Sequence, residues 1–221
     1  MAKVVLFGNG QVASVIHQYL TFDSEHEVVA FTIDRDHLGD MTEVMGLPLV
    51  AFEDVERLYP PDEHQMFVSV SYREVNRLRE RKYHEAKAKG YTLLTYVSSG
   101  ASVWPNVVLG DNVFIMEQNV IQPFVEIGSD CIIWSGNHIG HHTTIDAHCF
   151  IASHVVIAGF VKVGPRCFFG VNATVRDGIT IAPDCVVGAG ALLLKDTQEK
   201  GVYVGAASPL FPRRSDQLRG I

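Results

Sequence analysis

A six-residue repeat dominates the second half of this 221-residue sequence. From Val103 to Leu193 every sixth residue is large and apolar, and fifteen of these sixteen positions are Val, Ile or Leu. A second column, two residues earlier in each repeat, holds small or β-branched residues from Val107 to Ala191. Because side chains two apart lie on one side of a strand, both columns should face one interior. The pattern predicts a parallel β-helix, with three repeats forming each triangular coil.

Four cysteines recur with the period of the coil. Cys131, Cys149, Cys167 and Cys185 are spaced by 18 residues, so they should stack on one inner face. No Cys-x-x-Cys pair suggests a zinc site, and burial raises the pKa of a thiol. We therefore interpret these cysteines as core residues rather than as metal ligands or acyl-carrying nucleophiles.

Glycines and asparagines also follow the repeat. Asn119 and Asn137 are one coil apart, which suggests an internal ladder of amides that satisfy one another. The alternative is that Asn137 binds substrate, because it lies four residues before His141. Six glycines each follow a column residue, where we expect the chain to turn sharply and a Cβ to be costly: Gly110, Gly128, Gly140, Gly164, Gly170 and Gly188.

The first 97 residues show alternating strand and helix patterns, which predict a small parallel α/β sheet. The chain then divides into an α/β domain (1–97), a β-helix (98–205) and a C-terminal tail (206–221). Basic residues between 73 and 89 are interleaved with glutamates, which indicates a solvated helix face. The expected strands are 3–8, 28–33, 65–71 and 93–96, and the expected helices are 11–20 and 75–89.

A glycine-rich turn joins the first strand to the first helix. Gly8-Asn9-Gly10-Gln11-Val12-Ala13 fits the G-x-G-x-x-A pattern, in which glycines admit phosphates to the N-terminus of a helix. Asp34 ends the second strand, where its carboxylate can accept from a ribose hydroxyl or a base edge. A domain this short holds one mononucleotide-binding half, so a nucleotide sugar fits better than a dinucleotide. The alternative is a turn needed only for packing. The other candidate substrate-binding residues here are Arg35, Ser71 and Tyr72.

Composition narrows the possible partners. The chain has 18 Lys+Arg and 25 Asp+Glu, a formal net charge of −7, which disfavours nucleic-acid binding. No run approaches the ~18 apolar residues of a membrane helix, and no signal-peptide core follows Met1. We therefore expect a cytoplasmic protein without nucleic-acid or membrane partners.

Together these features resemble the hexapeptide-repeat acyltransferases, which have a left-handed β-helix. The resemblance is closest to the group of sialic-acid O-acetyltransferases and N-acetyltransferases of nucleotide-linked 4-amino sugars. It covers nearly the whole chain, including the Gly8/Gly10 turn, the coils and the closing segment from Lys195 to Gly205. It implies acetyl-CoA as co-substrate, no metal, and a homotrimer with active sites between neighbouring β-helices.

Five histidines fall within residues 138–154. Three of them are six residues apart, so they occupy different corners of the coil and cannot meet at a metal within one subunit. The resemblance implies that His141 is the catalytic residue, since it holds the third place of its hexad. A neutral imidazole there can take the proton from an attacking amine or hydroxyl. His142 stands where relatives carry an acidic residue, and we expect it to orient His141.

The resemblance also implies where the substrates bind. Acetyl-CoA would follow the stacked turns at Gly159, Gly170, Val171, Gly188 and Ala189, with Lys195 near its phosphates. The N–H of Gly159, one coil above His141, would face the developing oxyanion. Trp134 replaces an asparagine of the amino-sugar enzymes, so the acceptor pocket should be reshaped around an aromatic ring.

These expectations favour direct acetyl transfer from acetyl-CoA to the amine of a nucleotide-linked amino sugar. O-acetylation of a sugar or sialic acid is the first alternative. A non-catalytic nucleotide-sugar-binding trimer is the second, and the absence of an acidic residue at position 142 is its main support.

Overall fold

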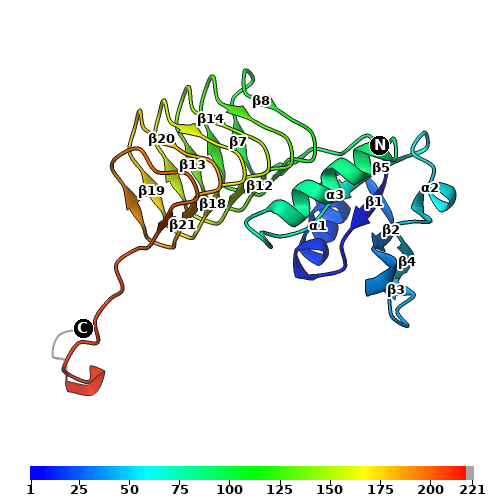
Figure 1. Ribbon diagram of the computed structural model, residues 1–221, viewed down its shortest axis with the longest axis horizontal. Helices are drawn as coiled ribbons and strands as arrows, with labels where there is room; N and C mark the ends of the chain where they lie inside the picture. The colour runs from blue at the N-terminus through cyan, green and yellow to red at the C-terminus, as the bar shows by residue number, and fades with distance from the viewer. Residues whose placement is uncertain (218–221) are drawn as a thin grey trace.

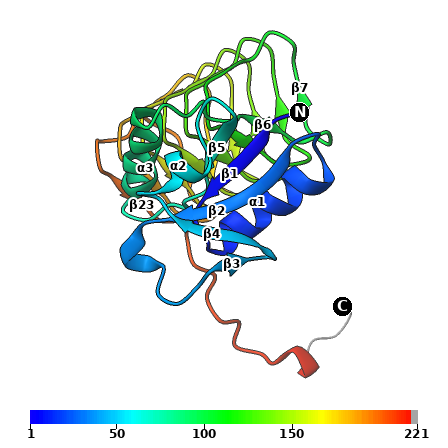
Figure 2. The ribbon, with the colours of Figure 1, turned by 90° about the vertical axis from the view of Figure 1, so that its right-hand side faces the viewer.

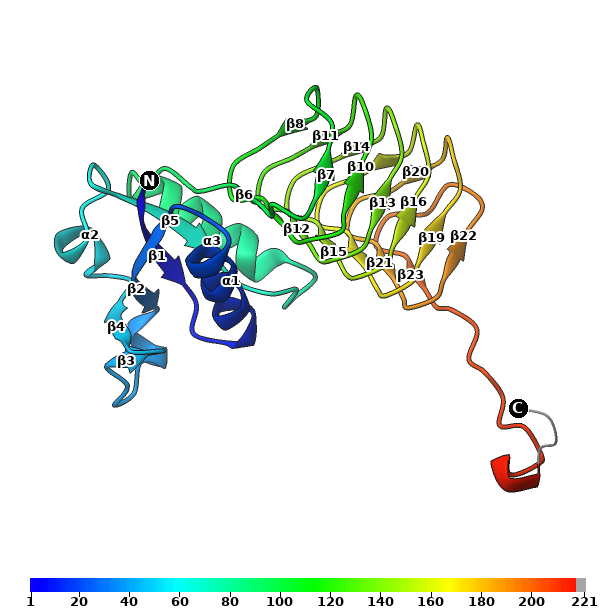
Figure 3. The same ribbon diagram turned by 180° about the vertical axis from the view of Figure 1, so that it is seen from behind.

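The structure, a computed structural model that describes residues 1–217, consists of an α/β domain at one end of a long prism of stacked coils (Figure 1). The α/β domain covers one side of the prism near its N-terminal end, and the last coils lie at the far end (Figure 3). None of the helices in residues 1–217 combines the length and hydrophobicity needed to cross a lipid bilayer.

The N-terminal domain is a five-stranded sheet with the order β3-β4-β2-β1-β5, parallel except for the β3–β4 hairpin. Apolar runs form the central strands, and α1 and α3 pack on opposite faces of this sheet. The elements are β1 (Lys3–Phe7), α1 (Gln11–Phe22), β2 (Glu27–Ile33), η1 (Arg35–His37), β3 (Glu43–Val44), β4 (Leu47–Ala51), α2 (Val55–Leu58), β5 (His64–Val68) and α3 (Arg77–Ala88). The predicted parallel α/β sheet is confirmed.

One strand prediction is wrong. Instead of a fourth sheet strand over 93–96, Leu93 makes a single bridge to Met66. The next residues, β6 (Tyr96–Val97), pair with β9 and form the first rung of the β-helix. The coils therefore begin before residue 98. The β3–β4 hairpin and α2 were also missed, because these short segments lack a clear hydrophobic period.

The β-helix has three parallel sheets, one on each side of the prism. Strands pair with the strand 18 residues further along, as Val120 pairs with His138, and only the last pair, β21 with β23, is 16 residues apart. We name the sides the covered face, the open face and the polar face. The covered face contains β6, β9 (Phe114–Ile115), β12 (Ile132–Ile133), β15 (Phe150–Ile151), β18 (Phe168–Phe169), β21 (Val186–Val187) and β23 (Val202–Tyr203). The open face contains β7 (Ser102–Val103), β10 (Val120–Ile121), β13 (His138–Ile139), β16 (Val156–Ile157), β19 (Thr174–Val175) and β22 (Leu192–Leu193). The polar face contains β8 (Val108–Leu109), β11 (Glu126–Ile127), β14 (Thr144–Ile145), β17 (Lys162–Val163) and β20 (Thr180–Ile181).

The repeat columns form the core of the prism. From Ile115 to Leu193 every residue of the first column is at most 5% exposed. The four cysteines are fully buried in the second column, as predicted. Burial raises the pKa of the Cys149 and Cys185 thiols, which disfavours the thiolate that a nucleophile or metal ligand needs.

The internal amide ladder is also observed. The Oδ1 atom of Asn119 accepts from the Asn137 backbone N–H at 3.2 Å, and Oδ1 of Asn137 accepts from Val155 N–H at 2.6 Å. The Asn137 amide donates to the Trp134 carbonyl. Because Asn137 is 1% exposed and its polar groups are engaged, the prediction that it binds substrate is wrong.

The glycines allow close contact between coils. A Cβ on Gly140 would lie 2.4 Å from the backbone nitrogen of Gly159 in the next coil. In each turn, the position two residues after the one that Gly140 holds has the left-handed backbone conformation. His142 and His148 are examples, with φ of 59° and 65°. Asn, Asp and His tolerate this conformation better than most residues, which explains why histidines recur at six-residue spacing.

The three faces differ in what covers them. Outward side chains of the covered face, such as Phe114 and Ile132, are buried under the N-terminal domain. The polar face carries exposed charges, including Glu126 and Lys162. The outward positions of the open-face strands hold no Lys, Arg, Asp or Glu, and include Leu192, which is 61% exposed. A single chain therefore leaves one uncharged side of its prism uncovered.

Helix α3 joins the two domains through a buried arginine. Arg79 is fully buried, and its guanidinium lies 3.3 Å from the carboxylate of Asp130. It also donates to the backbone carbonyls of Asp130, His148 and Cys149 in two successive coils. The predicted solvated face is therefore wrong for Arg79, which enters the corner between the polar and covered faces.

Candidate active site

A cavity of about 1140 Å³ lies between the N-terminal domain and the covered face. Figure 2 shows the sheet and α1 of the N-terminal domain in front of the coils of the β-helix. Among the predicted binding residues, the lining includes Gly8, Asn9, Gly10, Gln11, Asp34, Ser71, Tyr72, Trp134, Gly170, Val171 and Ala189.

The glycine turn forms the end of the cavity nearest α1. Gly8 has a φ of +122°, and a Cβ there would lie 2.9 Å from the Ser69 hydroxyl, so a larger residue is strained. Gly10 caps α1 without a side-chain hydrogen bond. The first N–H groups of α1 thus have no side-chain cap, and Gly10 and Gln11 line the cavity. This arrangement suits a phosphate group.

Opposite charges lie on the wall beside this turn. Lys82 donates to Asp34 at 2.6 Å and to Glu85 at 2.7 Å. Burial alone would lower the pKa of the Lys82 ammonium, but the two carboxylates outweigh it and hold the pKa above its usual value. Lys82 is therefore charged at neutral pH beside the candidate phosphate site.

The Arg35 side chain lies outside the lining of the cavity, and its role in substrate binding stays a prediction. Its side chain forms an exposed ion pair with Asp54 at 2.7 Å, and its backbone N–H donates to Glu53. It lies at the start of η1, on the outer surface next to Asp34. Sequence proximity to Asp34 suggested a shared role, but the turn after β2 directs the two side chains to different partners.

Aromatic rings line the side of the cavity formed by the β-helix. Trp134, Phe150 and Phe168 come from successive coils, and the Phe150 and Phe168 rings stack with centroids 5.7 Å apart. Tyr72, on the loop after β5, contacts both phenylalanines edge-on or at a tilt. These rings provide a flat apolar surface, on which a sugar or a base can lie.

His141 lies outside this cavity, at the corner between the open and polar faces. Its backbone N–H donates to Gln122 at 2.9 Å, and its Nδ1 atom lies 3.1 Å from Nδ1 of His142. The His142 ring is stacked between Phe124 and Phe160, with centroid distances of 4.6 and 4.9 Å. This stacking holds the His142 ring in contact with His141, and the orienting role of His142 stays a prediction.

Gly159 leaves space for the His141 ring. A Cβ on Gly159 would lie 3.0 to 3.1 Å from Cε1 and Nε2 of His141. The Nε2 atom of His141 is thus next to the backbone of the following coil, and Nδ1 is engaged with His142. The predicted proximity of His141 and Gly159 is confirmed by this geometry.

The predicted acetyl-CoA residues are divided between two corners of the prism. Gly159 and Lys195 follow open-face strands and share the corner of His141. Gly170, Val171 and Ala189 follow covered-face strands and line the cavity, with Gly188 adjacent. The open face lies between these corners, so one chain does not bring the two groups together.

The comparisons with known proteins agree with this architecture. The family model described as bacterial transferase hexapeptide (six repeats) matches residues 106–141 and 124–159, and the hexapeptide repeat of succinyl-transferase matches residues 160–195. A structure of perosamine N-acetyltransferase from Caulobacter crescentus is 29% identical, covering 93% of this chain and 94% of that one, with a TM-score of 0.83. The chain is a hexapeptide-repeat acyltransferase. None of the curated proteins matches it.

Two further structures share this architecture. The Caulobacter crescentus structure cited above is a histidine-to-asparagine variant in complex with CoA and GDP-perosamine. The protein without that substitution, in the same complex, has a TM-score of 0.79 at 29% identity over 93% of this chain and 95% of that one. The acetyltransferase domain of PglB from Neisseria gonorrhoeae, 23% identical over 95% of this chain and 100% of that one, has a TM-score of 0.82 and shares the fold. The left-handed β-helix fold is thereby confirmed.

Replacing Gly159 by alanine is expected to lower kcat of this acyltransferase. The added methyl group would contact the His141 ring at 3.0 Å and displace its Nε2 atom. Gly100→Ala is a matched control, since its Cβ would meet Glu117 at a similar 3.1 Å, but at a corner remote from His141. Steady-state kinetics and thermal unfolding of both variants check the prediction, and equal kcat values for both would contradict it.

Proposed function

We propose that this protein transfers the acetyl group of acetyl-CoA to the amine of a nucleotide-linked amino sugar. The observation that carries the proposal is that one chain contains both a glycine turn at the end of a large cavity and a histidine beside Gly159. The 29% identity with perosamine N-acetyltransferase over 93% of the chain supports the same reaction class.

The cavity supplies the parts that a nucleotide sugar needs. The N-terminus of α1 and the Lys82 ammonium would bind the diphosphate, and Asp34 would accept from the nucleoside. The sugar would then lie along Trp134 and the neighbouring rings. The cavity also has room for a ligand of this size, since ligand sites commonly span ~300–1,000 Å³.

His141 would act as the general base. Its Nδ1 atom faces His142, so Nε2 is the atom that accepts the proton from the attacking amine. The amine nitrogen adds to the thioester carbon to form a tetrahedral oxyanion. Its collapse breaks the bond from that carbon to sulfur, and the departing thiolate takes the proton held on Nε2 of His141 and leaves as the CoA thiol. The backbone N–H of Gly159 would donate to the carbonyl oxygen, on which negative charge develops. The four cysteines are fully buried, so acetyl-CoA cannot reach their thiols to form an acyl-enzyme.

Assembly as a homotrimer would complete this site. The cavity and His141 lie on either side of the open face, whose outward side chains are exposed and without charge. If open faces pack around a threefold axis, the His141 corner of one copy meets the cavity corner of its neighbour. Acetyl-CoA would then lie between copies, in contact with both groups of predicted residues. Phe124 and Phe160, which are 57% and 56% exposed, would be covered there.

Mass spectrometry of the products tests the reaction. The purified protein is incubated with acetyl-CoA and a panel of GDP-, UDP- and dTDP-linked amino sugars, beside the corresponding hydroxy sugars. The gain of one acetyl group on an amino sugar supports N-acetylation. Acetylation of hydroxy sugars alone would favour the O-acetyltransferase instead. No product, together with no binding of acetyl-CoA, would favour a non-catalytic binding protein.

Mixed oligomers are expected to regain activity if each site uses two copies. His141→Asn removes the base, and Gly10→Glu places an anion at the phosphate site, where a Cβ has nothing within 4 Å. Each variant alone should be inactive. After unfolding and refolding together in equal amounts, about a quarter of the sites in a random trimer would combine an intact base with an intact cavity.

Activity of the mixture near a quarter of the wild-type value checks this prediction. Each variant refolded alone is the control. A mixture that stays as inactive as its parents, despite forming hybrid trimers, would place the base and the cavity in one chain.

A further inference from the structure

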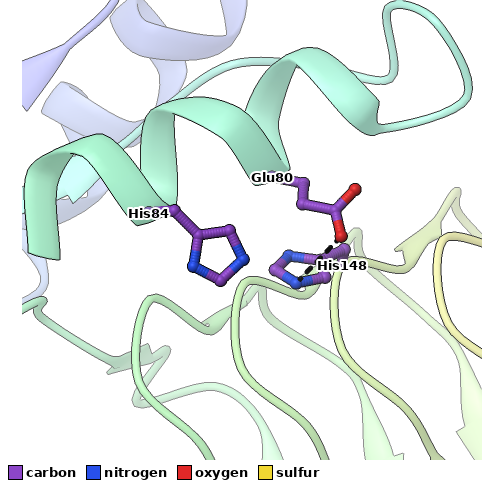
Figure 4. A group of neighbouring side chains, drawn as sticks. All are labelled: Glu80, His84 and His148. Carbon is purple, nitrogen blue, oxygen red and sulfur yellow. Dashed lines mark ion pairs between the residues drawn. The ribbon is translucent and has the colours of Figure 1, made fainter.

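A second group of polar side chains lies outside the cavity, where α3 meets the β-helix. Glu80 and His84 are one turn apart on α3, and His148 lies in the turn between β14 and β15. One ligand atom from each of the three lies within 4.8 Å of the others. Figure 4 shows both helix side chains directed toward the His148 ring. The mechanism proposed above uses none of these residues.

The His148 ring is held in one orientation. Its Nδ1 atom lies 2.8 Å from the carboxylate of Asp130, which can only accept, so Nδ1 carries the proton. Asp130 is fully buried and fixed by Arg79 and by the side-chain amide of Asn112. The carboxylate–imidazole contact leaves the lone pair of Nε2 directed toward Glu80, whose Oε1 atom is 3.7 Å away.

The Nε2 atom makes no hydrogen bond within residues 1–217, and it lies 3.7 Å from the Glu80 carboxylate at the edge of the group. A histidine that donates from one nitrogen to a carboxylate, with the other nitrogen directed at further ligands, is the usual arrangement at metal sites.

We propose that Glu80, His84 and His148 bind a divalent cation of the zinc type. Ligands about 2.1 Å from a tetrahedral Zn²⁺ are ~3.4 Å apart, close to the observed separation of Nε2 and Oε1. His84 is exposed, so its ring can rotate to complete the set, and a water takes the fourth position. Two imidazoles and one carboxylate select Zn²⁺, Co²⁺ or Ni²⁺ over Mg²⁺ and Ca²⁺.

Arg166 is the nearest competing cation, with Nη1 3.1 Å from Oε1 of Glu80. Arg166 has a stronger partner, because Nε and Nη2 both donate to Asp184 at 2.8 and 3.2 Å. The Arg166 guanidinium holds the pKa of Asp184 below its usual range, which agrees with this pairing. Glu80 can therefore turn to a metal ion while Arg166 stays paired.

The cation would connect the two domains. Glu80 and His84 belong to the N-terminal domain, whereas His148 belongs to the β-helix. The same helix supplies Leu78 and Lys82 to the wall of the cavity. A metal ion here would fix one wall of the cavity relative to the coils without touching the reacting groups.

Titration of the chelator-treated full chain with Zn²⁺ tests the proposal by calorimetry, and titration with Co²⁺ tests it by visible absorption. We expect one ion per chain, a tetrahedral Co²⁺ spectrum, and a melting temperature that rises with Zn²⁺. His84→Asn removes an exposed ligand without disturbing the core, and should weaken binding by at least about tenfold. Glu80→Gln should do the same. His17→Asn, on α1 and away from the cluster, should bind as the wild type does.

Two results would overturn the proposal. One is the absence of saturable binding to the wild type. The other is equal affinity and stoichiometry in the wild type and His84→Asn, which would assign the bound ion to other imidazoles such as the His141–His142 pair. Neither readout depends on acetyl transfer, so failure of the metal site and failure of the proposed reaction remain distinguishable.

Discussion

Replacing His141 by asparagine is expected to lower kcat by ~10²- to 10⁴-fold, which is the usual contribution of a general base. Asparagine keeps a polar side chain of similar reach, but it has no nitrogen lone pair able to accept the proton. His141 lines no part of the cavity, and the effect should therefore fall on kcat. Initial rates over a range of acceptor concentrations separate kcat from KM.

Binding of the nucleotide sugar is the companion measurement. The nucleotide sugar should bind His141→Asn and the wild type with the same dissociation constant. The cavity that binds it keeps its phosphate turn and Lys82 in both proteins. His17→Asn, on α1, controls for the loss of any histidine and should retain full activity. If His141→Asn kept wild-type kcat, the base would have to be another group.

The sequence predicts the β-helix well because its repeat is local and rigid. Each coil places the same positions inward, so one period identifies the strands, the core and the stacked cysteines together. The position of His141 beside Gly159 follows from the same arithmetic, since the residues are one coil apart. The glycine turn is equally local, because the backbone conformation of Gly8 and the start of α1 depend on a few neighbouring residues.

Features that depend on contact between the two domains were not predictable in this way. The pattern of charges on α3 is that of a solvated helix, and nothing local indicates that Arg79 is directed at free carbonyls of the coils.

Asn137 was ambiguous because a ladder amide and a ligand-binding amide look alike in one sequence. The Glu80/His84 spacing was visible as one helical turn, but its partner His148 is 64 residues further along than His84.

The position of His141 relative to the cavity shows a further limit. Both parts of the proposed site were predicted from the sequence, and the structure places them on either side of the open face. The proposed reaction therefore requires that another copy bring the two parts together. The exposed, uncharged strands between the two parts are therefore as informative about function as the polar residues themselves.

Replacing Arg79 by methionine is expected to destabilise the protein by ~3–5 kcal/mol, as is typical when one partner of a buried ion pair is removed. Methionine retains much of the length and volume of the side chain but leaves Asp130 and several corner carbonyls without their donor. Asp130 would keep its hydrogen bonds with Asn112 and His148 but would lose its guanidinium partner. Urea unfolding monitored by far-UV circular dichroism measures the loss as a shift in the midpoint.

Arg77→Met is a matched control on the same helix. Arg77 pairs with Asp184, but its side chain is 44% exposed, so its removal should cost less than about 1 kcal/mol. Arg79 contacts both the loop after β5 and two coils of the prism. Without Arg79, the two domains should unfold separately. The main transition then exposes less surface, and its m-value should fall. Equal costs for the two substitutions would mean that the buried guanidinium does not hold the domains together.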